Sequence, residues 1–213
     1  MARIHDRNAE NLGAEIQNLF SNCDETETAL ANPDMHHSGG LRQRDRLVGL
    51  ADLCARKYAG DMVEIGAHVG ETSVRLAEVA VRHKRRLIVI DPWLSGSQDC
   101  EGDEYEMFLE RIQPYQQSVD IWRASSMEPD ILRRLRLRPL CFGFVDGWHI
   151  MKACYSDIMA CGHTAGVISV DDSRYNLDLQ FISRVAAKKL GRLFVQDPYQ
   201  RECHLIPDSL LQK

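Results

Sequence analysis

The chain has 213 residues, of which 44% are hydrophobic and 27% are charged, and this composition indicates one ordinary globular domain with a sizeable core. The formal net charge of -5 gives no electrostatic footprint for nucleic acid. No apolar stretch is long enough to span a bilayer, and the polar N-terminus predicts no signal peptide. We therefore expect neither a nucleic acid nor a membrane as a partner.

The first part of the chain, residues 1–40, is predicted to be a helical region and a linker, because residues 31–40 are rich in turn formers. Residues 41–213 are predicted to form the main domain, in which short apolar runs alternate with helical patterns. The predicted strands cover 62–66, 86–91, 118–124, 140–146 and 165–172, and the predicted helices cover 71–83, 104–113, 128–136, 150–161 and 177–189.

The end of the chain changes character. Two further strand-like runs, 191–197 and 202–208, are separated only by "PYQR", which is too short for a crossover helix. They are therefore predicted to form an antiparallel hairpin. The expected fold class is α/β: a Rossmann-like, doubly wound, mostly parallel seven-stranded sheet with a C-terminal antiparallel hairpin.

Cysteine usage indicates the redox environment. The chain has seven cysteines, an odd number, and no CxxC pair. Cys141, Cys154 and Cys161 lie in or beside apolar runs, so we expect reduced, buried thiols in a cytoplasmic protein. A zinc site is the weaker interpretation, because the spacing matches no common ligand pattern.

Carboxylates follow four of the five predicted parallel strands. Glu64 ends the first of these strands, Asp91 the second, Asp146 the fourth, and Asp171 and Asp172 the fifth. In open α/β sheets, ligands bind at the carboxyl ends of the strands. Several converging acids are unfavourable unless they face cations, hydroxyls or solvent, so this rim is predicted to be a site.

The first acid belongs to a glycine turn, Glu64-x-Gly66-x-x-x-Gly70-x-Thr72-Ser73. The spacing is neither the G-x-G-x-x-G of a dinucleotide site nor a phosphate loop. An acid before the first glycine repels a phosphate but attracts an ammonium group. A plain turn with two glycines is the alternative.

Asp91 lies about 20 residues beyond this turn, where an acid typically accepts hydrogen bonds from both ribose hydroxyls. A cofactor with an ammonium group, a free ribose and no essential phosphate fits these acids, and S-adenosylmethionine has that description. The motif E-x-G-x-x-x-G-x-T-S followed by V-I-D-P-W resembles class I S-adenosylmethionine-dependent methyltransferases over roughly residues 49–197.

The resemblance implies roles for particular residues. Glu64 and Gly66 would lie near the methionine part of the cofactor, Asp91 would bind the ribose, and the segment with Ser125 and Ser126 would flank the adenine. Gly70, Thr72 and Ser73 would complete the cofactor-binding turn, and Trp93 would pack near the adenine. Two alternatives stay open: the serines are loop caps, and Trp93 anchors its loop in the core.

The second half of the predicted site combines Asp146, Asp171 and Asp172 with His149. Three carboxylates suit a hard divalent ion such as Mg²⁺, which would coordinate the acceptor hydroxyl and lower its pKa. His149 and Asp146 are the predicted catalytic residues, with the imidazole taking the hydroxyl proton. The pattern D-G-x-H followed by an acidic pair resembles the group of metal-dependent sugar O-methyltransferases that act on macrocin and mycinamicin.

Other interpretations of these residues stay open. Asp146 and the pair Asp171–Asp172 are also good helix caps, and His149 is also compatible with a structural histidine. Arg42, Arg44 and Arg46 flank the predicted acceptor pocket, although a solvated helix face explains them as well.

The sequence therefore predicts a Mg²⁺-dependent O-methyltransferase that acts on a hydroxyl of a small molecule, a sugar or a specialised metabolite. The competing functions are an NAD(P)-dependent oxidoreductase on a similar sheet and a non-catalytic methyltransferase-like binding module. General statistics of oligomers favour a homodimer.

Overall fold

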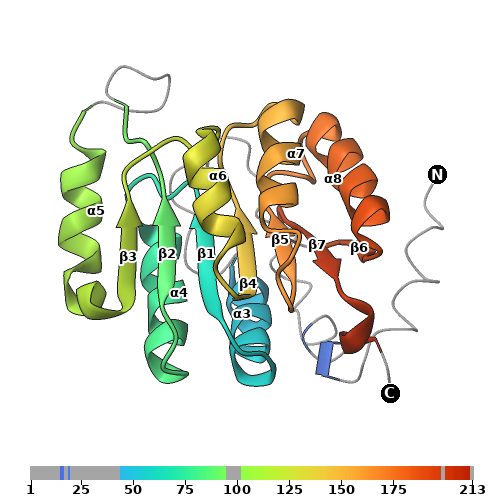
Figure 1. The fold of residues 1–213 in the computed structure, drawn as a ribbon, viewed down its shortest axis with the longest axis horizontal. Coiled ribbons are helices and arrows are strands. Elements are labelled where there is room, and N and C mark those ends of the chain that lie inside the picture. Colours follow the sequence, from blue (N-terminus) through green and yellow to red (C-terminus); the bar gives the residue numbers. More distant parts are fainter. Residues whose placement is uncertain (1–14, 17–18, 20–43, 95–101, 198–199, 212–213) are drawn as a thin grey trace.

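The computed structural model describes residues 15–16, 19, 44–94, 102–197 and 200–211. Its centre is a seven-stranded sheet with the order β3-β2-β1-β4-β5-β7-β6 (Figure 1). The strands are β1 (Asp61–Ile65), β2 (Leu87–Ile90), β3 (Val119–Trp122), β4 (Leu140–Val145), β5 (Ile168–Val170), β6 (Leu193–Gln196) and β7 (Cys203–Ile206). Strand β7 pairs antiparallel with both β5 and β6, whereas the pairs among β1 to β5 are parallel. The predicted fold class is confirmed.

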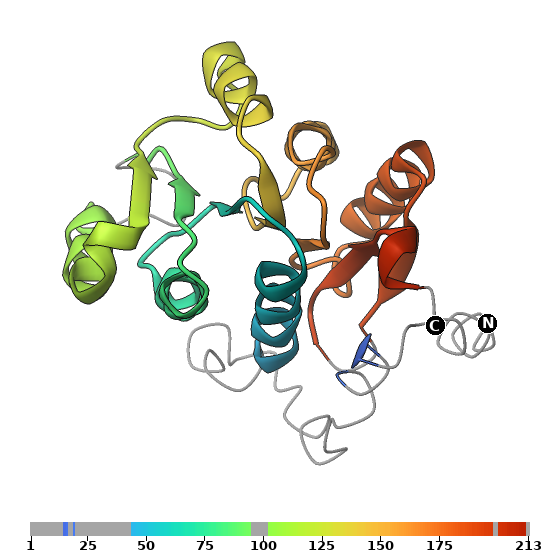
Figure 2. The same cartoon turned by 60° about the horizontal axis from the view of Figure 1, so that its bottom comes forward.

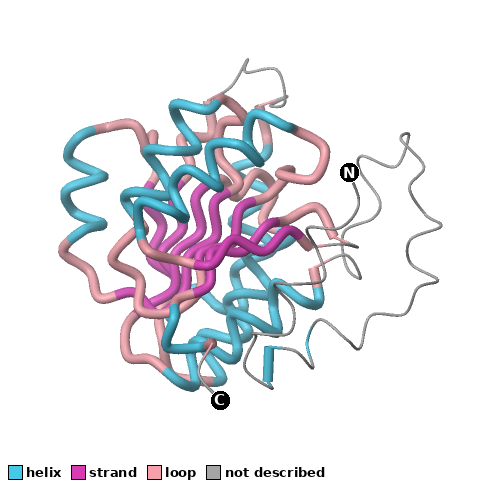
Figure 3. The backbone as a smooth tube through the Cα atoms, turned by 90° about the vertical axis from the view of Figure 1, so that its right-hand side faces the viewer, coloured by secondary structure: helices cyan, strands magenta, loops and turns pink. Residues whose placement is uncertain are grey.

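Helices cover both faces of the sheet. Figure 2 shows α3, α4 and α5 on one side and α6, α7 and α8 on the other, and Figure 3 shows the strands between the two layers. The helices are α3 (Asp45–Lys57), α4 (Glu71–Arg82), α5 (Glu104–Ile112), α6 (Pro129–Arg136), α7 (Met151–Ala160) and α8 (Leu177–Leu190), with short 3-10 helices η2 (Gln113–Ser118) and η3 (Asp208–Leu210). Helix α3 was not predicted as a separate element; the helices between the strands match their predicted ranges within one residue at each end.

The core has two halves because successive strand residues point to opposite faces of the sheet. In β1, Met62 packs into the cluster formed with α3, α4 and α5. Val63 and Ile65 pack into the cluster on the side of α6, α7 and α8. The five described cysteines are buried and free, among them Cys141 and Cys154, which confirms the expectation of buried thiols. No helix in the described part of the chain is long and apolar enough to cross a membrane.

The strand register gathers the predicted site residues. Ile65 pairs with Ile90 on one side and with Val145 on the other, and Val145 pairs with Val170. The residue after each of these strands therefore lies at the same edge of the sheet, at the top of Figure 1. Apart from residues 15–16 and 19, the predicted region 1–40 lies outside the described residues, as does part of the loop after β2, residues 95–101, so the domain boundary at residue 40 stays a prediction.

Candidate active site

Two glycines shape the turn after β1. Gly66 has a φ of 86°, and a Cβ atom there would meet the backbone oxygen of Asp146 at 2.0 Å. Gly70 has a φ of 85° at the N-cap of α4, where a Cβ atom would meet Cδ2 of Phe108 at 2.9 Å. Both positions require glycine because a side chain would be strained and would collide with neighbouring atoms. Gly66 thus lets the turn after β1 pass directly against the turn after β4.

Glu64 is fully buried at the end of β1. Its Oε2 accepts a hydrogen bond from Oγ of Ser73 at 2.6 Å, while its Oε1 is buried and has no hydrogen-bond partner among the described residues. Burial raises the pKa of this carboxyl to about 8, against the opposing effects of the Ser73 hydroxyl and the Arg44 guanidinium. A buried carboxyl with one open oxygen is chemically suited to bind a cationic or hydrogen-donating ligand group.

Asp91 closes the other side of the turn. Its Oδ2 accepts hydrogen bonds from the backbone amides of Ala67 and His68 at 2.8 and 3.1 Å, and its Oδ1 accepts from the amide of Trp93 at 2.7 Å. The carboxyl group is half-buried, and a carboxylate has about four lone-pair sites, so both oxygens retain capacity for further hydrogen bonds. The structure therefore brings Asp91 next to the turn that carries Glu64, as predicted from its position.

Trp93 belongs to an aromatic cluster after β2. Its ring packs against Tyr105 and Phe108, with ring centroids 4.9 and 4.7 Å apart, and its Nε1 donates a hydrogen bond to the carbonyl of His68 at 2.8 Å. The side chain is buried and already uses its one donor, so these contacts match the alternative in which Trp93 anchors its loop. Contact with the adenine stays a prediction.

The remaining predicted cofactor contacts are hydroxyl side chains. Ser73 is buried and donates its hydroxyl hydrogen bond to Glu64, and Thr72 is buried in the first turn of α4. The Oγ of Ser125 accepts a hydrogen bond from the amide of Met127 at 3.2 Å, as a loop cap does. Ser126 lies beside Asp157. Burial raises the pKa of the Asp157 carboxyl to about 7, and the Ser126 hydroxyl opposes this rise. Roles for these residues in cofactor binding stay predictions.

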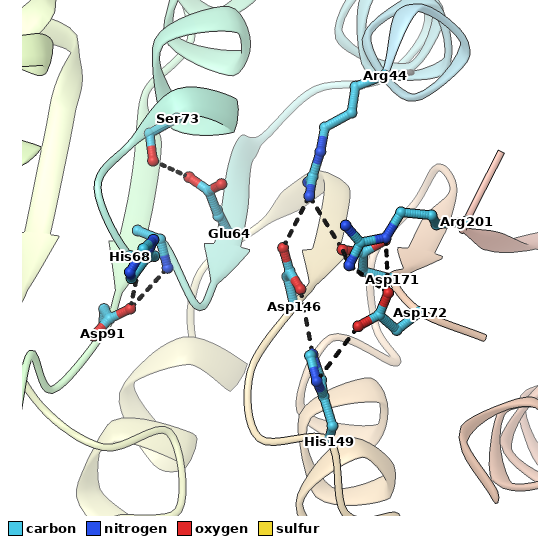
Figure 4. A network of polar contacts seen from close by, with 11 residues as sticks. Arg44, Glu64, His68, Ser73, Asp91, Asp146, His149, Asp171, Asp172 and Arg201 are labelled. Carbon is cyan, nitrogen blue, oxygen red and sulfur yellow. Dashed lines mark hydrogen bonds and ion pairs between the residues drawn. The ribbon is translucent and has the colours of Figure 1, made fainter. Parts of the chain in front are cut away.

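The three aspartates of the second half do meet, but each contacts an arginine (Figure 4). Nη2 of Arg44 lies 3.3 Å from Oδ2 of Asp146 and 3.1 Å from Oδ2 of Asp171. Nη2 of Arg201 lies 3.3 Å from that same oxygen of Asp171 and also contacts Oδ1 of Asp172. We call these five side chains, Arg44, Asp146, Asp171, Asp172 and Arg201, the arginine–carboxylate cluster. In the described part of the chain, no group of three or more His, Cys, Asp or Glu side chains is arranged to hold a metal ion.

The charges in this cluster are strongly coupled. Burial raises the pKa of Asp146 to about 6, and the neighbouring Asp171 carboxylate acts in the same direction. Burial also favours the neutral form of Asp171, but the guanidinium groups of Arg44 and Arg201 outweigh it and hold the pKa below its usual range. The charge of Arg44 is likewise stabilised, because burial is outweighed by Asp171, Asp146, Glu202 and Glu64. Arg44 therefore faces acids of both halves of the site.

His149 lies at the border of the cluster, with 48% of its side chain exposed. Its Nε2 is 3.6 Å from Oδ1 of Asp146, and its Nδ1 is 3.4 Å from Oδ2 of Asp172. These contacts are longer than normal hydrogen bonds, so they orient the ring without locking it. The Asp146 carboxylate, helped by Asp172 and opposed by burial, raises the pKa of the imidazole.

The cap interpretations of these acids are not supported. The N-cap of α7 is Ile150 and that of α8 is Asn176, whose side chain accepts from the amides of Asp178 and Leu179. Asp146 and Asp172 precede these caps by several residues and point toward the cluster (Figure 4).

The sequence interpretation placed Arg44 and Arg46 beside the acceptor pocket but did not predict that arginines pair with the acids of the cluster; Arg42 lies outside the described residues. A solvated helix face, the alternative for Arg44 and Arg46, is wrong: both side chains are largely buried, and Arg46 forms an ion pair with buried Asp197. Arg201 and the buried Glu202 were not singled out either. The usable signal was the excess of acids at one rim, which requires compensating cations from elsewhere in the chain.

Apolar side chains are exposed around the same edge of the sheet. In the sequence, some of them flank His149 after β4, and the others follow Asp172 after β5. These residues are Trp148, Ile150, Met151, Tyr175, Leu177 and Phe181. Aromatic and aliphatic surface next to polar groups is typical of a binding site for an organic molecule.

Comparisons with known proteins define the class of fold. No known protein family and no curated protein sequence matches the chain. Among solved structures, it is similar to CalS11, a TDP-rhamnose 3'-O-methyltransferase of calicheamicin biosynthesis, with a TM-score of 0.57, 12% identity and coverage of 90% of this chain and 91% of that chain.

Two further solved structures are similar. TomG, an O-methyltransferase from Streptomyces achromogenes in complex with S-adenosylmethionine, has a TM-score of 0.56 and 19% identity over 86% of this chain and 90% of its own. An O-methyltransferase from Bacillus cereus, bound to S-adenosylhomocysteine, has a TM-score of 0.52 and 14% identity over 93% of this chain and 100% of its own. The chain thus has the fold of class I S-adenosylmethionine-dependent methyltransferases, which confirms the resemblance at the level of the fold.

Proposed function

We propose that the chain is an S-adenosylmethionine-dependent O-methyltransferase that acts on a hydroxyl group of a small molecule. The observation that carries the proposal is the open Oε1 of buried Glu64, at the end of β1 beside a glycine turn. An ammonium group is the ligand group that such an oxygen favours most, because it replaces a lost hydrogen bond and a missing countercharge together. The fold likeness to O-methyltransferases supports the same activity.

The residues around the turn fit this cofactor. Glu64 would accept from the ammonium group, and Asp91 would accept from the ribose hydroxyls with the lone pairs that its backbone contacts leave open. When bound, the cofactor supplies an electrophilic methyl group on a sulfonium. The glycine turn positions these two acids on adjacent strand ends, so that one molecule would reach both.

His149 is the proposed base for the acceptor hydroxyl. Its ring is half-exposed at the edge of the arginine–carboxylate cluster, and Asp146 and Asp172 face its two nitrogens. Because both contacts exceed 3.3 Å, the acceptor hydroxyl would replace one of them and hydrogen-bond to the freed nitrogen. The remaining carboxylate would then stabilise the imidazolium that forms when the ring takes the proton.

A magnesium ion was expected from the resemblance, and its donor set would be Asp146, Asp171 and Asp172. Three carboxyl groups have the hard oxygen donors that Mg²⁺ prefers. In the folded chain, however, both guanidinium groups lie on these oxygens, and Oδ2 of Asp171 contacts two of them. This arrangement does not fit a bound divalent cation, so we assign no step to one; the magnesium dependence that the resemblance implies is tested by the metal titration described below.

The acceptor is proposed to be a sugar or a specialised metabolite with an apolar face. The exposed Trp148 and Tyr175 offer aromatic surface on either side of His149 and Asp172 in the chain. Aromatic rings bury large apolar areas and pack well on flat or alicyclic skeletons. Arg174, which is exposed beside Tyr175, is proposed to contact the polar part of the acceptor.

The test begins with calorimetric titration of the full chain with S-adenosylhomocysteine, and with NADH in a parallel titration. We expect saturable binding of S-adenosylhomocysteine and none of NADH. Transfer of a labelled methyl group to a panel of hydroxylated sugars and phenols then tests catalysis. Binding of NADH alone would replace the proposal with an oxidoreductase, and cofactor binding without transfer to any acceptor would favour a binding module.

Two proposals on partners accompany this function. The chain is proposed to act on its small molecule without nucleic acid or membrane, which binding to DNA, RNA or vesicles would contradict. A homodimer also stays a proposal, which light scattering of the purified chain tests.

A further inference from the structure

The place in the site where a divalent cation was expected contains two guanidinium groups. Nη2 of Arg44 bridges Asp146 and Asp171, and Nη2 of Arg201 bridges Asp171 and Asp172. Each carboxyl group of the three therefore has a cationic partner. A divalent ion would need these oxygens within about 2.0–2.6 Å of one point, without another cation beside them.

The two arginines are part of the packed structure. The Arg44 side chain is 16% exposed, and its guanidinium lies over the ring of Phe144, 5.1 Å from the ring centroid. Arg201 reaches Asp172 through Nε as well, at 2.7 Å. Displacing either group would remove one of the two countercharges of Asp171, whose side chain is 1% exposed, and this loss is unfavourable in a buried place.

We propose that Arg44 and Arg201 take the place of the divalent cation in this chain, so that the arginine–carboxylate cluster binds no metal ion. An arginine remains protonated at all working pH values and carries a planar set of donors. The cluster therefore has a permanent positive charge at the place where a metal-dependent enzyme would have to acquire one.

The cluster also positions His149. Asp146 is fixed by Arg44, Asp172 is fixed by Arg201, and the imidazole lies between these two carboxyl groups (Figure 4). Nη1 of Arg44 is buried and has no hydrogen-bond partner within the described residues, so a donor remains next to the cluster. This catalytic part of the inference rests on the proposed function, whereas the exclusion of a metal ion does not.

The experiment is a titration of the EDTA-dialysed full chain with Mn²⁺. Binding is monitored as the loss of the signal of free Mn²⁺ in electron paramagnetic resonance. Thermal unfolding with Mg²⁺ or with EDTA is the second readout. We expect no saturable Mn²⁺ site and no shift in melting temperature for the natural chain. A single Mn²⁺ site that disappears in Asp171→Asn would overturn the proposal.

The variants test replacement directly. In Arg44→Gln combined with Arg201→Gln, the carboxyl groups lose their countercharges, and we expect one new Mn²⁺ site and a melting temperature that rises with Mg²⁺. The matched control is Arg133→Gln, which alters an exposed ion pair on α6 and should bind no Mn²⁺. Absence of a new site in the folded double variant would also overturn the proposal.

If the double variant does not fold, the Mn²⁺ titration of the natural chain still tests whether the cluster binds a metal ion. Arg201→Gln then replaces the double variant, because Arg201 is the more exposed of the two arginines. Titration of the same samples with S-adenosylhomocysteine separates the two ideas. If the natural chain does not bind S-adenosylhomocysteine, the proposed function is contradicted. If the natural chain binds a metal ion at the cluster, only the role of the arginines is contradicted.

Discussion

The two halves of the site treat their buried acids in opposite ways. Beside the glycine turn, Glu64 is buried with one oxygen open, and its pKa is raised to about 8. In the arginine–carboxylate cluster, Asp171 is equally buried, but two guanidinium groups hold its pKa below the usual range. Among the described residues, no cation lies within ion-pair distance of Glu64, so this acid is prepared for a cation that arrives with a ligand, whereas Asp171 already contacts two guanidinium groups. The glycine turn is therefore suited to bind a positively charged ligand group, whereas the arginine–carboxylate cluster contains its own positive charges.

The largest effect is expected from His149→Ala. Removal of a general base lowers the rate of the chemical step by about 100- to 10,000-fold. We expect this loss in kcat, measured by transfer of a labelled methyl group, with binding of S-adenosylhomocysteine nearly unchanged. The matched control is His163→Ala, an exposed histidine whose Nε2 contacts the carbonyl of Arg138; it precedes β5, whereas the cluster follows that strand, so it lies toward the opposite edge of the sheet. An unchanged kcat in His149→Ala would remove the imidazole from the mechanism.

The next effect concerns Glu64→Gln. A hydrogen bond to a charged group contributes about 1.5–3 kcal/mol, so loss of the carboxylate should weaken cofactor binding by about 10- to 100-fold. Glutamine keeps the shape of the neutral acid and its contact with Ser73, so the fold should remain. Glu71→Gln, an exposed acid in the first turn of the following helix, is the control for calorimetry. Equal affinities in both variants would mean that Glu64 does not contact the cofactor.

A smaller effect is expected from pH. The Glu64 carboxyl has a pKa of about 8, so it is mostly protonated at pH 7, whereas a cationic ligand binds its ionised form. The ionisation of Glu64 should therefore favour binding of S-adenosylmethionine by about tenfold more at pH 9 than at pH 7, on top of the opposing titration of the ligand's own amino group, and ionisation of Glu64 on binding at pH 7 should release a proton. Asp146, Asp91 and Arg44 also influence this group.

Glu64→Gln provides the control for this pH dependence, because the variant retains the ligand's own titration and the other groups. The difference between the two pH profiles, measured by calorimetry in buffers of different ionisation enthalpy, belongs to Glu64. Two profiles of the same slope would contradict the assignment.

The smallest effect is expected from Trp148→Ala. This side chain is 59% exposed beside His149, and its loss should raise the KM for the acceptor several-fold while kcat stays within about twofold. Leu137→Ala removes an exposed apolar side chain just after α6 and serves as the control. Steady-state kinetics with the best acceptor of the panel measures both. A fall in kcat without a change in KM would place Trp148 outside the acceptor site.

Local patterns were sufficient to predict the sheet and its acids. A short apolar run of β-branched residues and leucine, such as residues 87–90, favours a strand covered on both faces, and an acid directly after such a strand lies at the carboxyl edge. The glycine spacing predicted the turn for the same reason, since a positive φ is needed there. The insertion of β7 between β5 and β6 was not predicted, because hairpin length determines pairing within the hairpin but not which strand joins the sheet.

The partners of the acids could not be predicted from local patterns. Arg44 reaches Asp146 and Asp171 across 102 and 127 residues of sequence, and no periodicity connects positions so far apart. Trp93 shows the same limit, because a tryptophan after a strand is compatible with a ligand face or with an aromatic core until Tyr105 and Phe108 are placed beside it. Whether a site acid is open or paired is decided by tertiary contacts, and that property distinguishes the two halves.

The span of these contacts also sets an order of assembly during synthesis. Glu64, Ser73 and Asp91 belong to neighbouring elements, so the two acids of the glycine turn and the Ser73 hydroxyl have all been synthesised soon after β2. The other half needs Arg44 from before α3 and Arg201 from the turn between β6 and β7 to meet on Asp171. Until that late hairpin docks, Asp171 has only one of its two cationic partners available. The final strands therefore complete the chemistry of the site as well as the sheet.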